Sequence, residues 1–85
     1  MRLEIERTAM RRLLDLPPKA RAAMTERLKA IAADPFAMHP NVKSLVGEKD
    51  VFRLRQGDWR AVYRIERIED VVRVLVIEIR GKVYR

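Results

Sequence analysis

Apolar and polar side chains alternate in several stretches of this chain, and this two-residue period predicts β-strands. Leu3 and Ile5 share one face of the first stretch, residues 1–6, and charged side chains occupy the other face. The remaining predicted strands lie in the second half of the chain, at Val51–Arg55, Trp59–Ile65 and Val71–Ile79. The last of them is apolar on both faces for much of its length, which predicts a central position in the sheet.

Two helices are predicted between the first and second strands. The first has Thr8 as its N-cap and ends at Pro17-Pro18, because proline removes a backbone donor. Its short apolar stripe consists of Met10, Leu13 and Leu14. Pro18 suits the first turn of the second helix, which ends at Asp34-Pro35. One continuous apolar face of that helix is made of Ala20, Met24, Leu28 and Ile31.

Residues 35–50 show no regular period, and their prolines and Gly47 predict a loop. The order of elements is therefore β-α-α-β-β-β. It predicts an α+β fold, in which an antiparallel sheet carries an N-terminal helical hairpin on one face. A length of 85 residues and a mass of 10.0 kDa predict a single domain over residues 1–85.

The composition excludes several classes of protein. Hydrophobic residues make up 48% of the chain, which argues against disorder although 36% of residues are charged. With no cysteine and one histidine, we expect neither disulfides nor a metal site, and we interpret His39 as structural or solvent-facing. The longest apolar runs, such as Val74–Ile77, are too short to span a membrane, and acids occupy the N-terminus. We therefore expect a cytoplasmic protein.

The net charge of +7 has two interpretations. It can keep a small protein in solution, or it can attract an anionic partner such as nucleic acid, a ribosome or an acidic protein. From residue 51 onward the chain has eight arginines and one lysine against five acids. Because the guanidinium fork suits bidentate phosphate contacts, this arginine excess favours an anionic partner.

Alternation places many of these arginines on one face of a predicted hairpin. If Gln56-Gly57 forms a two-residue turn, Arg53 lies opposite Arg60 and Arg55 opposite Asp58. The face toward the helices then holds Phe52, Leu54, Trp59, Ala61, Tyr63 and Ile65, and the other face holds Arg53, Arg55, Asp58, Arg60 and Arg64. Like charges opposite one another destabilise a strand pair, so an uncompensated Arg53–Arg60 pair suggests a seat for a phosphate or an acidic peptide. The alternative is that both arginines extend into solvent, and the pairing itself depends on the turn.

The C-terminal segment follows the last strand, with Gly81 as a bend. If it folds back, Arg80, Lys82 and Tyr84 reach the rim of the arginine face. Tyr84 would then lie beside several cations that favour its phenolate. The alternative is an ordinary terminal aromatic residue whose ring packs on the protein.

Motifs over essentially the whole chain resemble one known group of proteins. They are Leu45-Val46-Gly47, Phe52-Arg53-Leu54-Arg55, the run Gly57–Arg64, the valine-rich last strand, Arg80 and Val83-Tyr84-Arg85. This set resembles the RelE/ParE superfamily of bacterial toxins from type II toxin–antitoxin systems. Tyr84 makes the resemblance stronger to RelE-like members than to ParE-like members. The resemblance implies a RelE-like fold, similar to that of microbial ribonucleases.

The resemblance to RelE-like members implies that the protein cuts mRNA in the ribosomal A site, through attack of a 2′-hydroxyl on the adjacent phosphate. The resemblance assigns catalytic roles to Arg60, in transition-state stabilisation, to Arg80, at the leaving group, and to Tyr84, on the substrate. Phosphate or RNA contacts are expected from Arg53, Arg55, Arg64 and Lys82. One departure concerns Glu78 and Ile79, where many relatives have a glycine with histidine or arginine. No residue is an obvious general base.

The implied partners are a cognate antitoxin protein, the ribosome and mRNA, with DNA reached only through the antitoxin in operator autoregulation. No cofactor, metal ion or membrane is expected. Two other functions remain open from the sequence. A ParE-like protein would inhibit DNA gyrase without catalysing a reaction, and a non-toxic module would bind RNA or DNA. Aromatic residues for base stacking are scarce, at 6% of the chain, which disfavours the last function.

Overall fold

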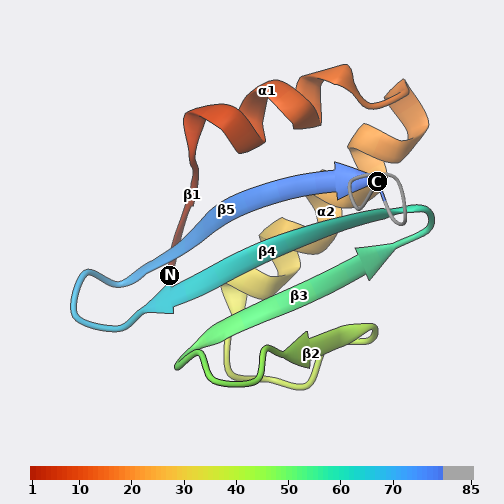
Figure 1. The fold of residues 1–85 in the computed structure, drawn as a ribbon. Coiled ribbons are helices and arrows are strands. Elements are labelled where there is room, and N and C mark those ends of the chain that lie inside the picture. The colour runs from red at the N-terminus through yellow and green to blue at the C-terminus, as the bar shows by residue number, and fades with distance from the viewer. Residues whose placement is uncertain (80–85) are drawn as a thin grey trace.

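The computed structural model describes residues 1–79. Within these residues, two helices and five strands follow one another (Figure 1). Their bounds are β1 Arg2–Ile5, α1 Arg7–Asp15, α2 Pro18–Ala33, β2 Val42–Ser44, β3 Val51–Gln56, β4 Trp59–Glu66 and β5 Val71–Ile79. The predicted α+β class is confirmed, as are the two predicted helices and the four predicted strands, β1, β3, β4 and β5.

The five strands form one sheet in the order β1-β5-β4-β3-β2. β5 therefore lies inside the sheet, as its apolar faces predicted. Two details of the prediction were wrong. β1 pairs with β5 in parallel, so the sheet is mixed, because alternation reports which face a side chain occupies but not the direction of a strand. β2 lies within residues 35–50, which were expected to form a loop, because three residues are too few to show a period.

The strand β1 leads directly into α1 without a side-chain cap. Glu6 is the N-cap residue, and the predicted cap, Thr8, is already inside the helix. The backbone explains this correction. The Glu6 N–H still donates to the Val74 carbonyl of β5 at 3.0 Å, while the Glu6 carbonyl accepts from the Met10 N–H at 2.8 Å. The same residue thus ends the strand ladder and begins the helix.

Both helices lie on one face of the sheet, and the face toward the viewer in Figure 1 carries no helix. Pro18 occupies the first turn of α2, as predicted. The predicted apolar face of α2 is buried: Met24, Leu28 and Ile31 are fully enclosed in the core, and Ala20 packs against it. The apolar residues of the β3–β4 hairpin meet this face from the sheet side. Among these apolar residues, the rings of Phe52 and Tyr63 are stacked, and their centroids are 5.4 Å apart.

The turn of the β3–β4 hairpin lies one residue further along the chain than predicted. Gln56 pairs with Trp59, so Gly57 and Asp58 are the two turn residues, and Gly57 adopts a φ of +60° that favours glycine. Arg55 therefore lies opposite Arg60, and Arg53 lies opposite Val62. The predicted Arg53–Arg60 and Arg55–Asp58 pairings were wrong. The assignment of these arginines to the face away from the helices was correct.

A candidate anion-binding site on the open face of the sheet

The face of the sheet that carries no helix is called the open face here. Its side chains lie in rows that cross the strands. In one row β3, β4 and β5 contribute Arg55, Arg60 and Glu78, which are paired in the sheet. Asn41 extends this row beyond β3, because the Arg55 N–H donates to the Asn41 carbonyl at 2.9 Å. The neighbouring row consists of Lys43, Arg53, Val62 and Val76. Strand pairing thus brings cations from β2, β3 and β4 together.

These rows enclose a cavity of about 300 Å³. It is lined by Asn41, Lys43, Arg53, Arg55 and Arg60. Four of the five lining side chains are cationic, and the fifth is an amide that can donate and accept hydrogen bonds. Such a lining suits a phosphate or a carboxylate, because guanidinium groups bind both in bidentate geometry.

Arg60 is a largely enclosed arginine of this site. Its side chain is 13% exposed, and its Nε lies 3.9 Å from Oε1 of Glu78 on β5. Glu78 is similarly enclosed, at 14%. The carboxylate reduces the net charge at this edge of the cavity, and it also restricts where the Arg60 guanidinium can lie.

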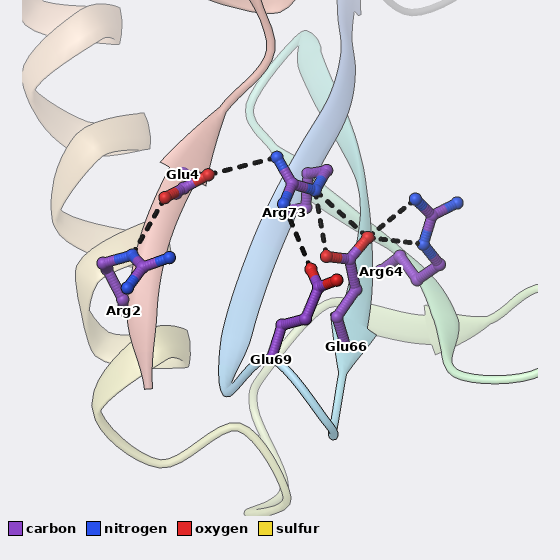
Figure 2. A network of polar contacts seen from close by, with 6 residues as sticks. All are labelled: Arg2, Glu4, Arg64, Glu66, Glu69 and Arg73. Atoms are coloured by element: carbon purple, nitrogen blue, oxygen red, sulfur yellow. Dashed lines mark hydrogen bonds and ion pairs between the residues drawn. The ribbon is translucent and has the colours of Figure 1, made fainter.

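A different arrangement stabilises the arginines near the β4–β5 turn. Arg64 and Arg73 are opposite one another on β4 and β5, and Figure 2 shows Glu66 between them. Glu66 accepts from Arg64 Nη2 at 2.7 Å and from Arg73 Nε at 3.0 Å. Arg73 Nη1 also donates to Glu4 at 3.1 Å, and Arg2 donates to Glu4 at 2.9 Å (Figure 2). Because each arginine of the Arg64–Arg73 pair has a carboxylate partner, this end of the face is close to neutral.

These contacts shift the ionisation of the groups involved. The hydrogen bond from Arg64 lowers the pKa of Glu66, with Arg73 adding to the effect. The pKa of Arg73 is raised, chiefly by its hydrogen bond to Glu66. Glu66 therefore stays ionised under conditions that protonate a free glutamate.

The predicted site residues fall into three groups. Arg53, Arg55 and Arg60 line the same cavity, whereas Arg64 lies outside it and is paired with Glu66. The other three, Arg80, Lys82 and Tyr84, lie outside the described residues.

Two lining residues, Asn41 and Lys43, were missed because the segment that contains β2 was expected to be a loop. A signal for them exists in the sequence. They flank the apolar Val42, and this polar–apolar–polar triplet is the shortest form of the alternation that predicts a strand.

His39 and the acidic residues give no sign of a metal centre. His39 Nε2 forms a 2.7 Å hydrogen bond with the Asp34 carbonyl after α2, in agreement with its structural interpretation. Within residues 1–79, no three histidine, aspartate or glutamate side chains are grouped so that they could hold a metal ion. No helix in the same range is long and apolar enough to cross a membrane.

Comparison with known proteins identifies the family. The family model for the ParE toxin of the type II toxin–antitoxin system parDE matches residues 3–84 of this chain. The chain belongs to this toxin family. No curated protein matches the sequence significantly.

Solved structures with the same fold come from RelE toxins and their complexes. The toxin resembles a chain of the archaeal RelE–RelB complex from Pyrococcus horikoshii, with 25% identity and a TM-score of 0.81 over 95% of this chain and 96% of that one. A chain of the Mycobacterium tuberculosis toxin–antitoxin complex RelBE2 is 30% identical, with a TM-score of 0.75 over 93% and 96% of the two chains. The isolated Escherichia coli RelE toxin has the same fold, with 22% identity and a TM-score of 0.81 over 98% and 89%. The predicted superfamily is thus confirmed.

Proposed function

We propose that this toxin is an endoribonuclease that cleaves mRNA on the ribosome and so inhibits translation. The observation that carries the proposal is the cavity lined by Lys43, Arg53, Arg55 and Arg60. It places four cations on an open sheet face, with an amide as the fifth lining side chain. A phosphodiester in this cavity would meet positive charge from three neighbouring strands.

The proposed reaction needs charge stabilisation more than a strong nucleophile in the protein. The 2′-oxygen of the RNA forms a bond to the adjacent phosphorus, and the bond from phosphorus to the 5′-oxygen breaks. The products are a cyclic phosphate and a 5′-hydroxyl, and the proton lost by the 2′-hydroxyl is balanced by the one gained by the leaving oxygen. Fixed guanidinium groups stabilise the extra negative charge on the phosphoryl oxygens in the transition state.

Arg60 is the residue to which we assign this stabilisation, because it is enclosed and its position is restricted by Glu78. Arg53 and Arg55 would add phosphate contacts from β3, the neighbouring strand. In the same proposal Arg80 acts at the leaving group, Tyr84 contacts the substrate and Lys82 adds a phosphate contact. Arg64 would take part only if its bond to Glu66 were exchanged for a bond to RNA.

A cognate antitoxin is the natural inhibitor of such a site. Relatives of similar fold have been solved in complex with RelB antitoxins from Pyrococcus horikoshii and Methanococcus jannaschii. For this toxin we propose an antitoxin with an acidic segment that covers the cavity, because charge complementarity favours it. Residues 1–85 would act as a single domain in the cytoplasm, and DNA would be reached only through the antitoxin.

A second candidate function is inhibition of DNA gyrase by binding, without catalysis. The match to the ParE toxin model favours it. Glu78 does so as well, since a carboxylate beside Arg60 weakens the attraction of that arginine for a phosphate. Both functions use the same fold, so they have to be separated by experiment.

The nuclease proposal is tested in a reconstituted translation reaction with purified toxin and a defined mRNA. We expect cuts with 5′-hydroxyl ends at ribosome-occupied codons. Arg60→Ala should slow cleavage by about 100-fold or more, because one fixed donor to the transition state is lost. Arg60→Lys keeps the positive charge but lacks the guanidinium fork. Its cleavage rate should therefore fall between those of the wild type and Arg60→Ala.

Arg7→Ala, at an exposed position on α1, is the matched control and should cleave normally. Thermal unfolding of each variant separates lost chemistry from lost folding. Cleavage by Arg60→Ala at the wild-type rate would refute the catalytic role of Arg60. Absence of any cleavage by the wild type, together with a block of gyrase supercoiling, would establish the second candidate instead.

A further inference from the structure

Asn41 differs in chemistry from every other lining residue of the cavity. Within the described residues, the cavity is otherwise lined by lysine and arginine, which are donors only. Contacts to phosphate position a nucleic acid but carry no sequence information. A primary amide has two donors and an acceptor, and it can recognise the edge of a base.

The backbone of Asn41 is held in place from two sides. On one side its carbonyl accepts the Arg55 N–H, and the next residue, Val42, pairs with Leu54 of β3. On the other side, Arg27 of α2 donates from Nη2 to the carbonyl of Pro40, and from Nη1 to Gln56 at 3.1 Å. The position of Asn41 is thus fixed by both a strand and a helix.

Asn41 itself adopts a left-handed backbone conformation, with a φ of +61°. Asparagine accepts this conformation more readily than other residues with a side chain, apart from aspartate. The conformation alone would therefore explain an asparagine here. What it leaves unexplained is that Asn41 is one of the residues that line the cationic cavity.

Distance along the row suggests what the amide contacts. Asn41 lies one strand from Arg55 and two strands from Arg60, so the midpoint between the two arginines is about 7 Å from Asn41 at ordinary strand spacing. This span is within the length of one nucleotide measured from its phosphate to the far edge of its base. A phosphate held between Arg55 and Arg60 would therefore leave its base within reach of Asn41. The bases of single-stranded RNA are free to be read on their edges.

We propose that Asn41 is a specificity-determining residue that reads adenine in the nucleotide whose phosphate lies on Arg55 and Arg60. Adenine is the base that an asparagine amide recognises with two hydrogen bonds, whereas guanine is matched by arginine or lysine. This inference rests on the proposed nuclease function. It extends that function to the choice of cleavage site.

The left-handed backbone decides which variants are informative. Asn41→Gly removes the amide and is free of strain at a positive φ. Asn41→Asp keeps the tolerance for this conformation but loses the amide donors. Lys43→Met is the matched control, because it removes a charge from the same cavity and leaves the amide in place.

One measurement uses short single-stranded RNAs with a 2′-deoxy sugar at the scissile position, which prevents cleavage. The four oligonucleotides differ in one base, and their dissociation constants are measured by fluorescence anisotropy. We expect the wild type to favour adenine by roughly 5- to 150-fold, the range for one bidentate amide–base contact. Asn41→Gly should lower this preference to about 2-fold or less, while Lys43→Met should weaken all four RNAs equally.

The second measurement maps 5′ ends across many translated mRNAs. Asn41→Gly should redistribute the cuts away from sites with adenine. An unchanged distribution in a cleaving Asn41→Gly variant would overturn the inference and leave the nuclease proposal intact. A preference for another base, lost in Asn41→Gly, would overturn the assignment to adenine. If the wild type cuts nothing, the nuclease proposal itself fails.

Discussion

Tyr63 places a phenol inside the core of the protein, where its side chain is almost fully enclosed between α2 and the sheet. Burial raises the pKa of Tyr63 to about 12, because the phenolate would lose its hydration. The charge of Arg27 opposes this shift but is the smaller effect. Folding therefore favours the neutral phenol.

This shift makes stability depend on alkaline pH in a defined direction. Below pH 10 both the folded and the unfolded states keep the phenol proton. Between pH 10 and about 12 the unfolded state loses it first, so the free energy of unfolding falls as the pH rises. At pH 11 the expected loss from this residue is about 1.4 kcal/mol relative to pH 8.5.

Urea unfolding at both pH values measures the effect, and Tyr63→Phe is the reference because it keeps the stacked ring and has no phenol proton. Other groups titrate equally in the two proteins, so the difference between them isolates Tyr63. Equal losses in wild type and Tyr63→Phe would show that the native state releases this proton as easily as the unfolded one.

Among the elements, β4, β5 and β1 are joined on the open face by the contacts of Glu66, Arg73 and Glu4 (Figure 2). The lowered pKa of Glu66 means that these contacts stabilise the folded state at pH values above the ordinary pKa of glutamate. Stability from this source is lost as the pH falls through the lowered pKa. Glu66→Gln should therefore melt at a lower temperature than the wild type at pH 7, and the difference should shrink as the pH falls through the lowered pKa of Glu66.

Glu69→Gln is the matched control for this comparison. Glu69 also faces Arg73, at 3.7 Å, but its side chain is 66% exposed. A surface pair of this kind contributes little to stability, so the control should melt close to the wild type at every pH. Melting curves of Glu66→Gln and wild type that stay parallel from pH 7 to pH 2 would contradict the role given to the ionised Glu66.

The β3–β4 hairpin shows which parts of an element can be predicted from sequence. Moving the turn from Gln56-Gly57 to Gly57-Asp58 shifts the pairing by two residues, and a shift of two leaves every side chain on its face. Alternation therefore placed Arg53 and Arg60 correctly on the open face. It could not decide which residue lies opposite which, because that is set by the backbone conformation of Gly57.

The candidate site was only partly predictable for a related reason. Periodicity finds long elements, such as α2 with its buried Met24 and Leu28, because many residues repeat the signal. The three residues of β2 give one alternation, and the pairing that fixes Asn41 and Lys43 in the cavity comes from the next strand, β3. Pairing between strands, rather than the pattern within one strand, assembles the cavity.

At the scale of the whole molecule, the charge of +7 is distributed unevenly over the surface. The arginines near the β4–β5 turn are balanced by Glu66 and Glu4, whereas the cavity at the other end gathers four cations. Two explanations of the proposed RNA binding follow from this. Either the total charge attracts RNA to any part of the surface, or the local arrangement of the cavity cations decides the affinity.

Two double variants of equal charge distinguish these explanations. Lys43→Gln with Arg55→Gln removes two cavity charges, and Arg7→Gln with Arg11→Gln removes two exposed charges from α1. Each lowers the net charge from +7 to +5, since two positive charges are lost. If the cavity binds the phosphates, the first variant releases fewer counterions on binding, and its slope of log affinity against log salt should be less steep by about 1.4 for single-stranded RNA.

The α1 variant should keep a slope close to that of the wild type, because its arginines act on RNA only through the screened field. Titrations of one RNA from 50 to 200 mM salt, by fluorescence anisotropy, measure all three proteins. Equal changes in slope for the two variants would mean that total charge governs binding and that the cavity does not bind the phosphates preferentially. A change confined to the cavity variant would place the RNA backbone at Lys43 and Arg55, in the cavity that Arg60 also lines.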